Sequence, residues 1–204
     1  MSQDIKIKIS NLTKIFGPKA KSVLKHVENG MNKDDLLKEH QHVLGLSNIN
    51  LDLENKNIEV IMGLSGSGKS TLIRHINRLI EPTTGSIMIG GEDVIQMPIE
   101  KLRLFRQQKT AMVFQSFALL PHKTVMDNIC LGIHLQGLKG DEATQRAKKW
   151  IDRVGLTGYE DRYPSQLSGG MQQRVGLARA LTCDTEILMT VSYTHLTLPT
   201  ICSV

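Results

Sequence analysis

A chain of 204 residues is long enough for one domain with a sizeable core, and its 40% hydrophobic and 22% charged residues are an ordinary globular balance. The formal net charge of +5 comes from basic residues spread along the chain, so the charge does not favour nucleic-acid binding. The N-terminus does not resemble a signal peptide, and no apolar run reaches the length of about 18 residues that spans a membrane. Three scattered cysteines without a C-x-x-C motif indicate a reducing compartment. We therefore expect a cytosolic protein that can sit on a membrane protein.

The first part of the chain is predicted to form strands around a helical insertion. Residues 4–9 alternate polar and apolar side chains, which predicts an edge strand. Phe16 precedes a turn, where an aromatic side chain is either part of the core or a ligand contact. Residues 19–46 are predicted to be a helical insertion, in which Gly30 ends one helix and Asn32 caps the next.

Three histidines in this insertion raise the question of a metal site. His26, His40 and His42 have no carboxylate or cysteine beside them at ligand spacing, so we do not predict a metal site here. After the insertion, the alternation from Ile49 to Leu53 predicts a strand that leads to the central motif.

The central motif of the chain is a glycine-rich loop at residues 63–71. It matches G-x-x-x-x-G-K-[ST], the phosphate-binding loop, whose glycines let backbone N–H groups point at phosphate. Lys69 can place a cation between the β- and γ-phosphates, and the Ser70 hydroxyl can reach a bound Mg²⁺. The apolar run 58–62 predicts a buried parallel strand before the loop, and a helix starting near Gly68 is predicted after it. The nucleotide-binding residues predicted in this loop are Gly63, Leu64, Ser65, Gly66, Ser67, Gly68, Lys69, Ser70 and Thr71.

Downstream of this helix the pattern returns to short strands. Residues 87–89 predict a strand and residues 90–91, both glycine, a hairpin turn. An amphipathic helix is predicted at 99–108. The apolar run 110–114 predicts a second buried strand, and Gln115 at its end occupies a position where ligands bind in parallel sheets. A solvent-exposed loop glutamine is the alternative.

The following part of the chain is predicted to be mostly helical. Residues 123–157 predict helices, the second of which is capped by Asp141 and ended by Gly155. A loop rich in Pro and Gly follows, and the apolar spacing from Met171 to Leu181 predicts a helix after it. Residues 168–170 then lie at a helix N-terminus, which makes a second anion site from backbone N–H groups and a hydroxyl.

Together, these motifs resemble those of the ATP-binding-cassette (ABC) ATPases. The stretch Leu167–Arg174 looks like the family's signature motif, and Ser168 lies 99 residues after Lys69, about the family's spacing. Gln115 matches the family's Q-loop glutamine. The chain is most similar to the ATP-binding subunit of glycine betaine/proline (quaternary amine) importers. That resemblance runs from about Ile5 to about Met189 and is carried by Met62–Thr71, Asn77–Thr83, Met112–His122 and the insertion at 19–46.

The resemblance implies an α/β, P-loop NTPase fold with a parallel core sheet, an antiparallel β subdomain and a helical subdomain at 116–170. It also implies that ATP and Mg²⁺ are the cofactors and that Phe16 stacks on the adenine. Lys69 and Gln115 are then the catalytic residues, and Ser70 and Gln115 are the metal ligands. The nucleotide contacts implied for the signature motif are Ser168, Gly169, Gly170 and Gln173.

The resemblance further implies an assembly. In the family two subunits pair head to tail, and the signature loop of one closes over the ATP on the P-loop of the other. The implied partners are a second copy of the chain, a membrane permease near residues 116–122, and a substrate-binding protein that acts through the permease; no nucleic-acid partner is implied. The implied location is cytoplasmic, peripheral on the inner face of the cell membrane.

The sequence departs from the family after Met189. The family's Walker B strand ends in Asp and then Glu. The Asp holds Mg²⁺ through water, and the Glu is the general base for the attacking water. Here Thr190 follows the strand, and Asp184 and Glu186 lie at its start, so the general-base Glu is absent. His195 resembles the family's switch histidine but comes too soon.

The last residues are also unusual in composition, because 187–204 contain no Asp, Glu, Lys or Arg. We therefore interpret residues 1–189 as an ABC nucleotide-binding domain that is incomplete at its C-terminus. Residues 190–204 are interpreted as a foreign tail, a truncation followed by a frameshift, cloning or assembly artefact. A divergent protein that ends in this way is the alternative.

Two main functional hypotheses follow. The first is an importer ATPase that couples ATP binding and hydrolysis to uptake of glycine betaine, proline or related quaternary amines. The second is a nucleotide-binding fragment without hydrolysis, because the Walker B Asp and Glu and the switch His are missing. A soluble cassette protein acting on ribosomes or DNA is a third hypothesis, but the segment from Gln115 to Ser168 leaves no room for the long coiled coil of the repair type.

Overall fold

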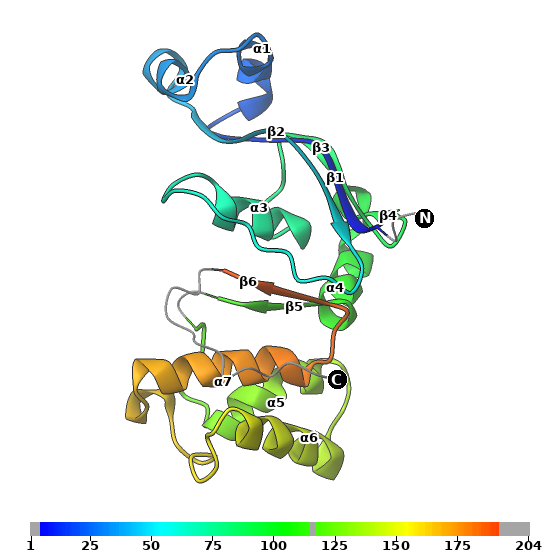
Figure 1. The fold of residues 1–204 in the computed structure, drawn as a ribbon, viewed down its shortest axis with the longest axis vertical. Coiled ribbons are helices and arrows are strands. Elements are labelled where there is room, and N and C mark those ends of the chain that lie inside the picture. The colour runs from blue at the N-terminus through cyan, green and yellow to red at the C-terminus, as the bar shows by residue number, and fades with distance from the viewer. Residues whose placement is uncertain (1–4, 115–116, 192–204) are drawn as a thin grey trace. The chain divides into compact units, whose positions relative to one another are not determined.

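The chain divides into two compact units after Leu102 in this computed structural model (Figure 1). The structure describes residues 5–114 and 117–191. Gln115, one of the predicted site residues, therefore lies outside the described residues. Among the helices that are described, none is long and apolar enough to cross a membrane.

The first unit is built on a four-stranded antiparallel sheet with the strand order β2-β1-β3-β4. One ladder pairs Ile9 of β1 with Leu51 of β2, and a second pairs Ile9 with Ile87 of β3. The edge strand predicted at residues 4–9 is therefore wrong, because alternation reports a half-buried face and not the number of neighbouring strands. The strands are β1 (Ile5–Phe16), β2 (Val43–Glu54), β3 (Thr84–Ile89) and β4 (Glu92–Asp93).

The turn from β3 to β4 is the predicted hairpin. Gly90 and Gly91 have φ angles of +56° and +84°, the left-handed conformation that a two-residue hairpin turn of this kind requires. A short 3₁₀ turn, η2 (Val94–Gln96), and helix α4 (Ile99–Gln108) follow, and α4 confirms the helix predicted at 99–108.

The helical insertion lies between β1 and β2. It contains the 3₁₀ turn η1 (Ala20–Val23) and helices α1 (Leu24–Glu28) and α2 (Lys33–His40), and β2 begins within its predicted C-terminal end. The Asn32 side chain accepts the Asp35 N–H at 2.9 Å, which confirms the predicted N-cap of the second helix. The insertion has a small core of its own, formed by Ile15, Val23, Val27 and Leu36.

Helix α3 (Lys69–Ile76) begins directly after Gly68, as predicted, but the segment before the loop differs from its prediction. Residues 58–62 form no strand, and Ile58 is 95% exposed. A strand is stabilised by its neighbours, and no strand in the described part of the chain pairs with this segment. The prediction of a buried parallel strand at 58–62 is therefore wrong in this structure.

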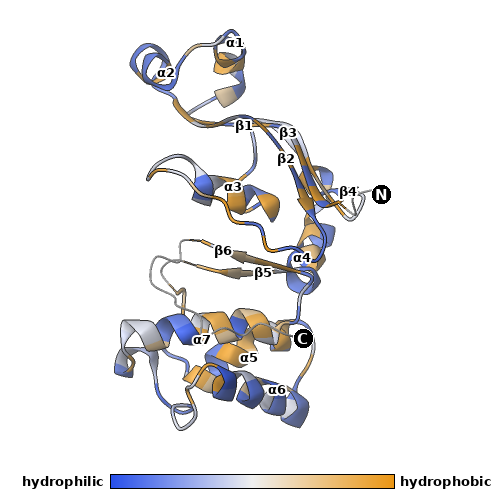
Figure 2. Cartoon of the chain, in the orientation of Figure 1, coloured by the Kyte–Doolittle hydropathy of each residue, from blue (hydrophilic) through white to orange (hydrophobic). Residues whose placement is uncertain are grey.

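The second unit contains a helical core. Apolar faces of α5 (Val125–Leu135), α6 (Gly140–Arg153) and α7 (Gly169–Thr182) pack together, and Figure 2 shows α5 as mainly hydrophobic and α6 as mainly hydrophilic. The predicted cap of α6 is wrong, because the N-cap is Lys139 and Asp141 lies in the first turn. The fully buried members of this core include Ile129, Ile133, Ala143, Ala147, Ile151, Leu156, Val175 and Ala178.

Two parallel strands complete the second unit. β5 (Thr110–Val113) confirms the strand predicted at 110–114, and it pairs in parallel with β6 (Ile187–Thr190). A salt bridge between Lys109 and Glu186 joins the residues that precede the two strands. Ala180 of α7 packs on β5, so the helix covers this short sheet.

Candidate functional site

The loop at residues 63–68 has the backbone that a phosphate-binding loop needs. Gly66 and Gly68 have φ angles of +77° and +93°, which an L side chain rarely adopts. A Cβ on Gly63 would lie 2.9 Å from the Ser67 hydroxyl oxygen, so a side chain there would require Ser67 to move. The loop is closed by a hydrogen bond from the Ser67 N–H to the Leu64 carbonyl at 3.2 Å.

Lys69 folds back over this loop. Its ammonium group donates to the carbonyl oxygens of Gly63 and Leu64, both at 2.7 Å, and lies 3.4 Å from the Ser67 hydroxyl oxygen. Phosphate oxygens can replace these carbonyls as acceptors, since they carry the charge that a lysine donor prefers. The geometry therefore keeps a cation at the mouth of the loop.

The first turn of α3 supplies further donors. The first helical bond runs from the Leu72 N–H to the Gly68 carbonyl at 2.8 Å, so the N–H groups of residues 69–71 are not used inside the helix. These groups and the helix dipole favour an anion at this end of α3. Ser70, predicted as a Mg²⁺ ligand, is the second residue of the helix.

Close backbone packing joins the loop to Phe16. A Cβ on Gly68 would lie 2.6 Å from the Gly45 carbonyl oxygen, and a Cβ on Gly45 would lie 2.6 Å from the Phe16 ring. Phe16 is the last residue of β1 and is 38% exposed. The structure thus brings the phosphate loop and Phe16 together through Gly45, a residue that the sequence analysis missed. The available signal was a glycine inside a strand, which often marks a close backbone approach.

The interior side of α3 carries a buried histidine. His75 is fully buried, and its Nδ1 lies 2.6 Å from the Thr71 carbonyl, which requires the proton on Nδ1. Burial lowers the pKa of His75, and the positive charge of Lys14 lowers it further. His75 is therefore held neutral inside the unit that carries the phosphate loop.

The signature residues lie at the exposed N-terminus of α7 in the second unit. Ser168 is the N-cap, and its hydroxyl accepts the Met171 N–H at 3.4 Å. Gly169 and Gly170 have open space where a Cβ would be, and Gln173 is half-buried on the first turns of the helix. Backbone N–H groups are thus presented at a second helix N-terminus, as predicted.

Arg179 holds the backbone of residues 117–118. Its guanidinium donates to the carbonyls of Phe117 and Ala118, both at 2.8 Å. Phe117 and Ala118 have φ angles of +58° and +47°, a costly conformation for residues other than glycine. Burial lowers the pKa of Arg179, although an arginine remains charged in proteins. The sequence analysis missed this residue.

In this α/β chain a glycine-rich loop leads into a helix, and a lysine folds over that loop. These features define the class of P-loop nucleotide-binding proteins. Comparison with known families agrees. A family model described as "ABC transporter" matches residues 46–190. The chain belongs to this family.

Several curated proteins are similar to most of the chain. The glycine betaine transport ATP-binding protein OpuAA of Bacillus subtilis (strain 168) is 49% identical over 91% of this chain and 44% of its own length. The glycine betaine/proline betaine transport system ATP-binding protein ProV of Escherichia coli (strain K12) is 48% identical over 91% of this chain and 46% of its own. The chain thus spans a little under half the length of these relatives.

A solved structure supports the fold. A dimeric ATP-binding cassette in a post-hydrolysis state, bound to ADP and Pi, matches with a TM-score of 0.75 and 30% sequence identity. The match covers 90% of this chain and 72% of that one. The fold is therefore that of a P-loop NTPase of the ABC type.

The burial of neutral His75 predicts a pH dependence of stability. Because the folded state lowers the pKa, the unfolded chain binds the proton first as pH falls, so stability is full above the ordinary value of about 6.5 and decreases below it. One proton taken up on unfolding removes roughly 1.4 kcal/mol per pH unit. Urea denaturation at about pH 7.5 and about pH 5.5 should show a smaller pH effect in His75→Gln than in the parent chain. An unchanged pH effect in His75→Gln would contradict this account.

The hydrogen bonds donated by Arg179 predict a loss of stability when this side chain is replaced. Arg179→Met leaves the Phe117 and Ala118 carbonyls without this donor, and we expect a decrease of about 1–3 kcal/mol in the free energy of unfolding. Arg179→Lys keeps the charge but not the planar pair of donors, so its stability should lie between those of the parent chain and Arg179→Met. Urea denaturation measures the stability of both variants. A Met variant as stable as the parent chain would show that these hydrogen bonds do not stabilise the fold.

Proposed function

We propose that this chain binds Mg²⁺-ATP at the phosphate loop, and the position of Lys69 over that loop is the observation that carries the proposal. Lys69 and the N–H groups of residues 63–71 bind the phosphates, and the Ser70 hydroxyl binds the metal. When bound there, Mg²⁺ would supply positive charge that neutralises the phosphates. Phe16, exposed and joined to the loop through Gly45, stacks on the adenine. Gln115 contributes a second metal ligand and senses the γ-phosphate.

The signature motif acts on the nucleotide of a second copy in this proposal. Ser168, Gly169, Gly170 and Gln173 close over ATP on the partner's phosphate loop, so that two chains in head-to-tail contact make two complete sites. Two observations support this: the N-terminus of α7 is exposed, and a related cassette has been solved as a dimer in two structures.

The relatives' names support a role in import. We propose that the chain is part of the ATP-binding subunit of an importer for glycine betaine, proline or related quaternary amines, because proteins named for glycine betaine transport are 47–49% identical to it. The remaining partners are then a membrane permease, contacted near residues 116–122, and a substrate-binding protein that acts through the permease. Such a subunit is cytoplasmic and peripheral on the inner face of the membrane.

Hydrolysis is a separate question from binding. Ligands and catalytic groups gather at the carboxyl ends of parallel strands, and β6 ends at Thr190 followed by Val191, neither of which is a carboxylate. Asp184 and Glu186 lie before the strand, where they pair with Arg146 and Lys109. We therefore propose that residues 1–189 form the nucleotide-binding domain and that the chain with residues 190–204 as written binds ATP without turning it over.

The binding proposal predicts the effect of removing the loop cation. Lys69→Ala should remove measurable Mg²⁺-ATP binding, since the variant loses the donor that neutralises the phosphates. Isothermal calorimetry measures the affinity, and Lys123→Ala, at an exposed lysine of the second unit, serves as a control that should bind as the parent does. Equal ATP affinity in the parent and Lys69→Ala would refute the site.

The turnover proposal predicts no phosphate release above that of Lys69→Ala. Loss of one positioned acid–base group typically costs about 10²–10⁴ in rate. Replacing residues 190–204 with a family-like continuation that begins Asp-Glu should restore turnover, and Gln in place of that Glu should abolish it again. Lys69-dependent phosphate release from the chain as written would contradict the proposal that this chain does not hydrolyse ATP.

A further inference from the structure

A lysine lies against the aromatic side chain that we assign to the base. Lys14 precedes Phe16 by two residues, so both side chains leave β1 on the same face of the sheet. The Lys14 ammonium lies 5.0 Å from the centre of the Phe16 ring. At that distance a cation is attracted to the face of an aromatic ring.

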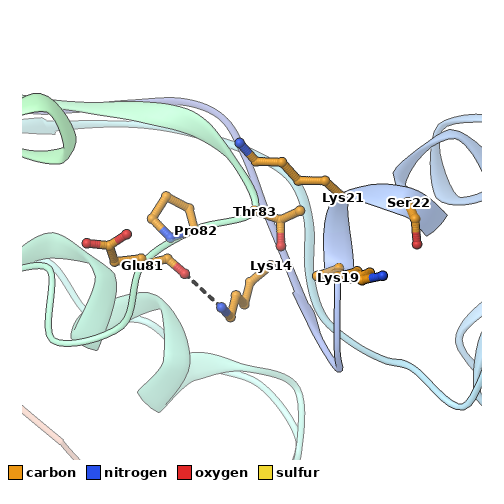
Figure 3. A pocket seen from close by; sticks show the side chains of 8 residues that line it. Lys14, Lys19, Lys21, Ser22, Glu81, Pro82 and Thr83 are labelled. Atoms are coloured by element: carbon orange, nitrogen blue, oxygen red, sulfur yellow. Dashed lines mark hydrogen bonds between the residues drawn. The ribbon is translucent and has the colours of Figure 1, made fainter.

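The lysine is held in place by a fixed acceptor. Its ammonium donates to the Glu81 carbonyl at 2.8 Å, the interaction drawn as a dashed line in Figure 3. Thr83 ties this turn to β1, since its N–H donates to the Thr13 carbonyl at 2.9 Å and its hydroxyl accepts the Ile15 N–H at 2.9 Å. The Glu81 carboxylate is engaged separately by Arg78 at 2.8 Å. The acceptor for Lys14 is therefore part of a rigid turn.

Gly45, which contacts Phe16, and Glu81, which accepts from Lys14, lie on opposite sides of β1. Gly45, which contacts the phosphate loop, belongs to β2, whereas Glu81 precedes β3, and β1 lies between β2 and β3. The Lys14 ammonium is thus drawn to the side of β1 away from the contact between Gly45 and the phosphate loop. Phe16 remains 38% exposed, so part of its ring is available to a ligand.

We propose that Lys14 is a positioning residue for adenine recognition: anchored on the Glu81 carbonyl, it holds the Phe16 ring in the orientation that stacks on the base. This inference rests on the proposed function, in which the phosphate loop binds ATP and Phe16 contacts the adenine. The role is distinct from phosphate binding, which belongs to Lys69 and the loop.

The neighbouring lysines do not share this role. A cavity of about 360 Å³ beside Lys14 is also lined by Lys19 and Lys21. In Figure 3 the ammonium groups of these lysines point in different directions, so they do not converge on a common anion. The contact with the ring, and not the number of positive charges, distinguishes Lys14.

The test compares two probes, Mg²⁺-ATP and inorganic Mg²⁺-tripolyphosphate, by calorimetry on the full chain. Lys14→Met keeps the apolar stem and removes the cation, and we expect its ATP affinity to fall about two- to fivefold, the range of an exposed cation–π contact. Tripolyphosphate affinity should not change, because that probe has no base. Lys14→Arg should restore ATP binding, and Lys21→Met, a matched loss of charge in the same cavity, should bind both probes as the parent does.

A double-mutant comparison makes the inference specific. In a Phe16→Ala background, Lys14→Met should have no further effect on ATP affinity, since its target is gone. Lys14→Gln, a second neutral variant, should behave as Lys14→Met. Unchanged or tighter ATP binding in both neutral variants would overturn the proposal, as would an equal loss for tripolyphosphate or a loss that persists without Phe16. Failure of the proposed function looks different: Lys69→Ala or Phe16→Ala would then bind ATP as the parent does.

Discussion

The contact between Gly68 and the Gly45 carbonyl is the constraint on which the nucleotide site depends. No side chain fits at Gly68, because a Cβ there would lie 2.6 Å from that oxygen and the φ angle of +93° is left-handed. The contact fixes the start of α3 against β2, and with it the direction of the first-turn N–H groups and of Lys69. Gly45 in turn packs against the Phe16 ring. The separation between the phosphate loop and the Phe16 ring is therefore set by close packing around two glycines.

In the second unit, polar side chains fix the backbone. Asn128 is fully buried on α5, where its side chain accepts the Leu120 N–H at 2.8 Å and donates to three carbonyls of residues 120–124. Arg179 on α7 binds the carbonyls of residues 117–118. Two helices thus fix one irregular segment whose backbone bonds could not be satisfied by a strand or helix of its own.

Several local features of this fold were predictable from the sequence, although the cap predicted at Asp141 was not correct. The start of α3, the Asn32 cap, the Gly90–Gly91 hairpin and the start of α7 each depend on residues within a few positions of one another. Neighbour relations were not predictable in the same way. Alternation at residues 4–9 indicated a strand but not that β1 would be central, and the apolar run 58–62 had the composition of a buried strand without a partner among the described strands.

The same distinction explains which site residues the sequence could identify. The phosphate loop is contiguous, so its chemistry is visible as a pattern, and the signature loop is a second contiguous pattern. Lys14 and Arg179 act instead on carbonyls 67 and 62 residues away, and a carbonyl has no sequence identity for a motif to record. Such a carbonyl comes within hydrogen-bond distance only after the chain has folded, and any residue type can supply it. Positioning residues of this kind are therefore found from geometry, even in a chain whose binding loop can be recognised at once.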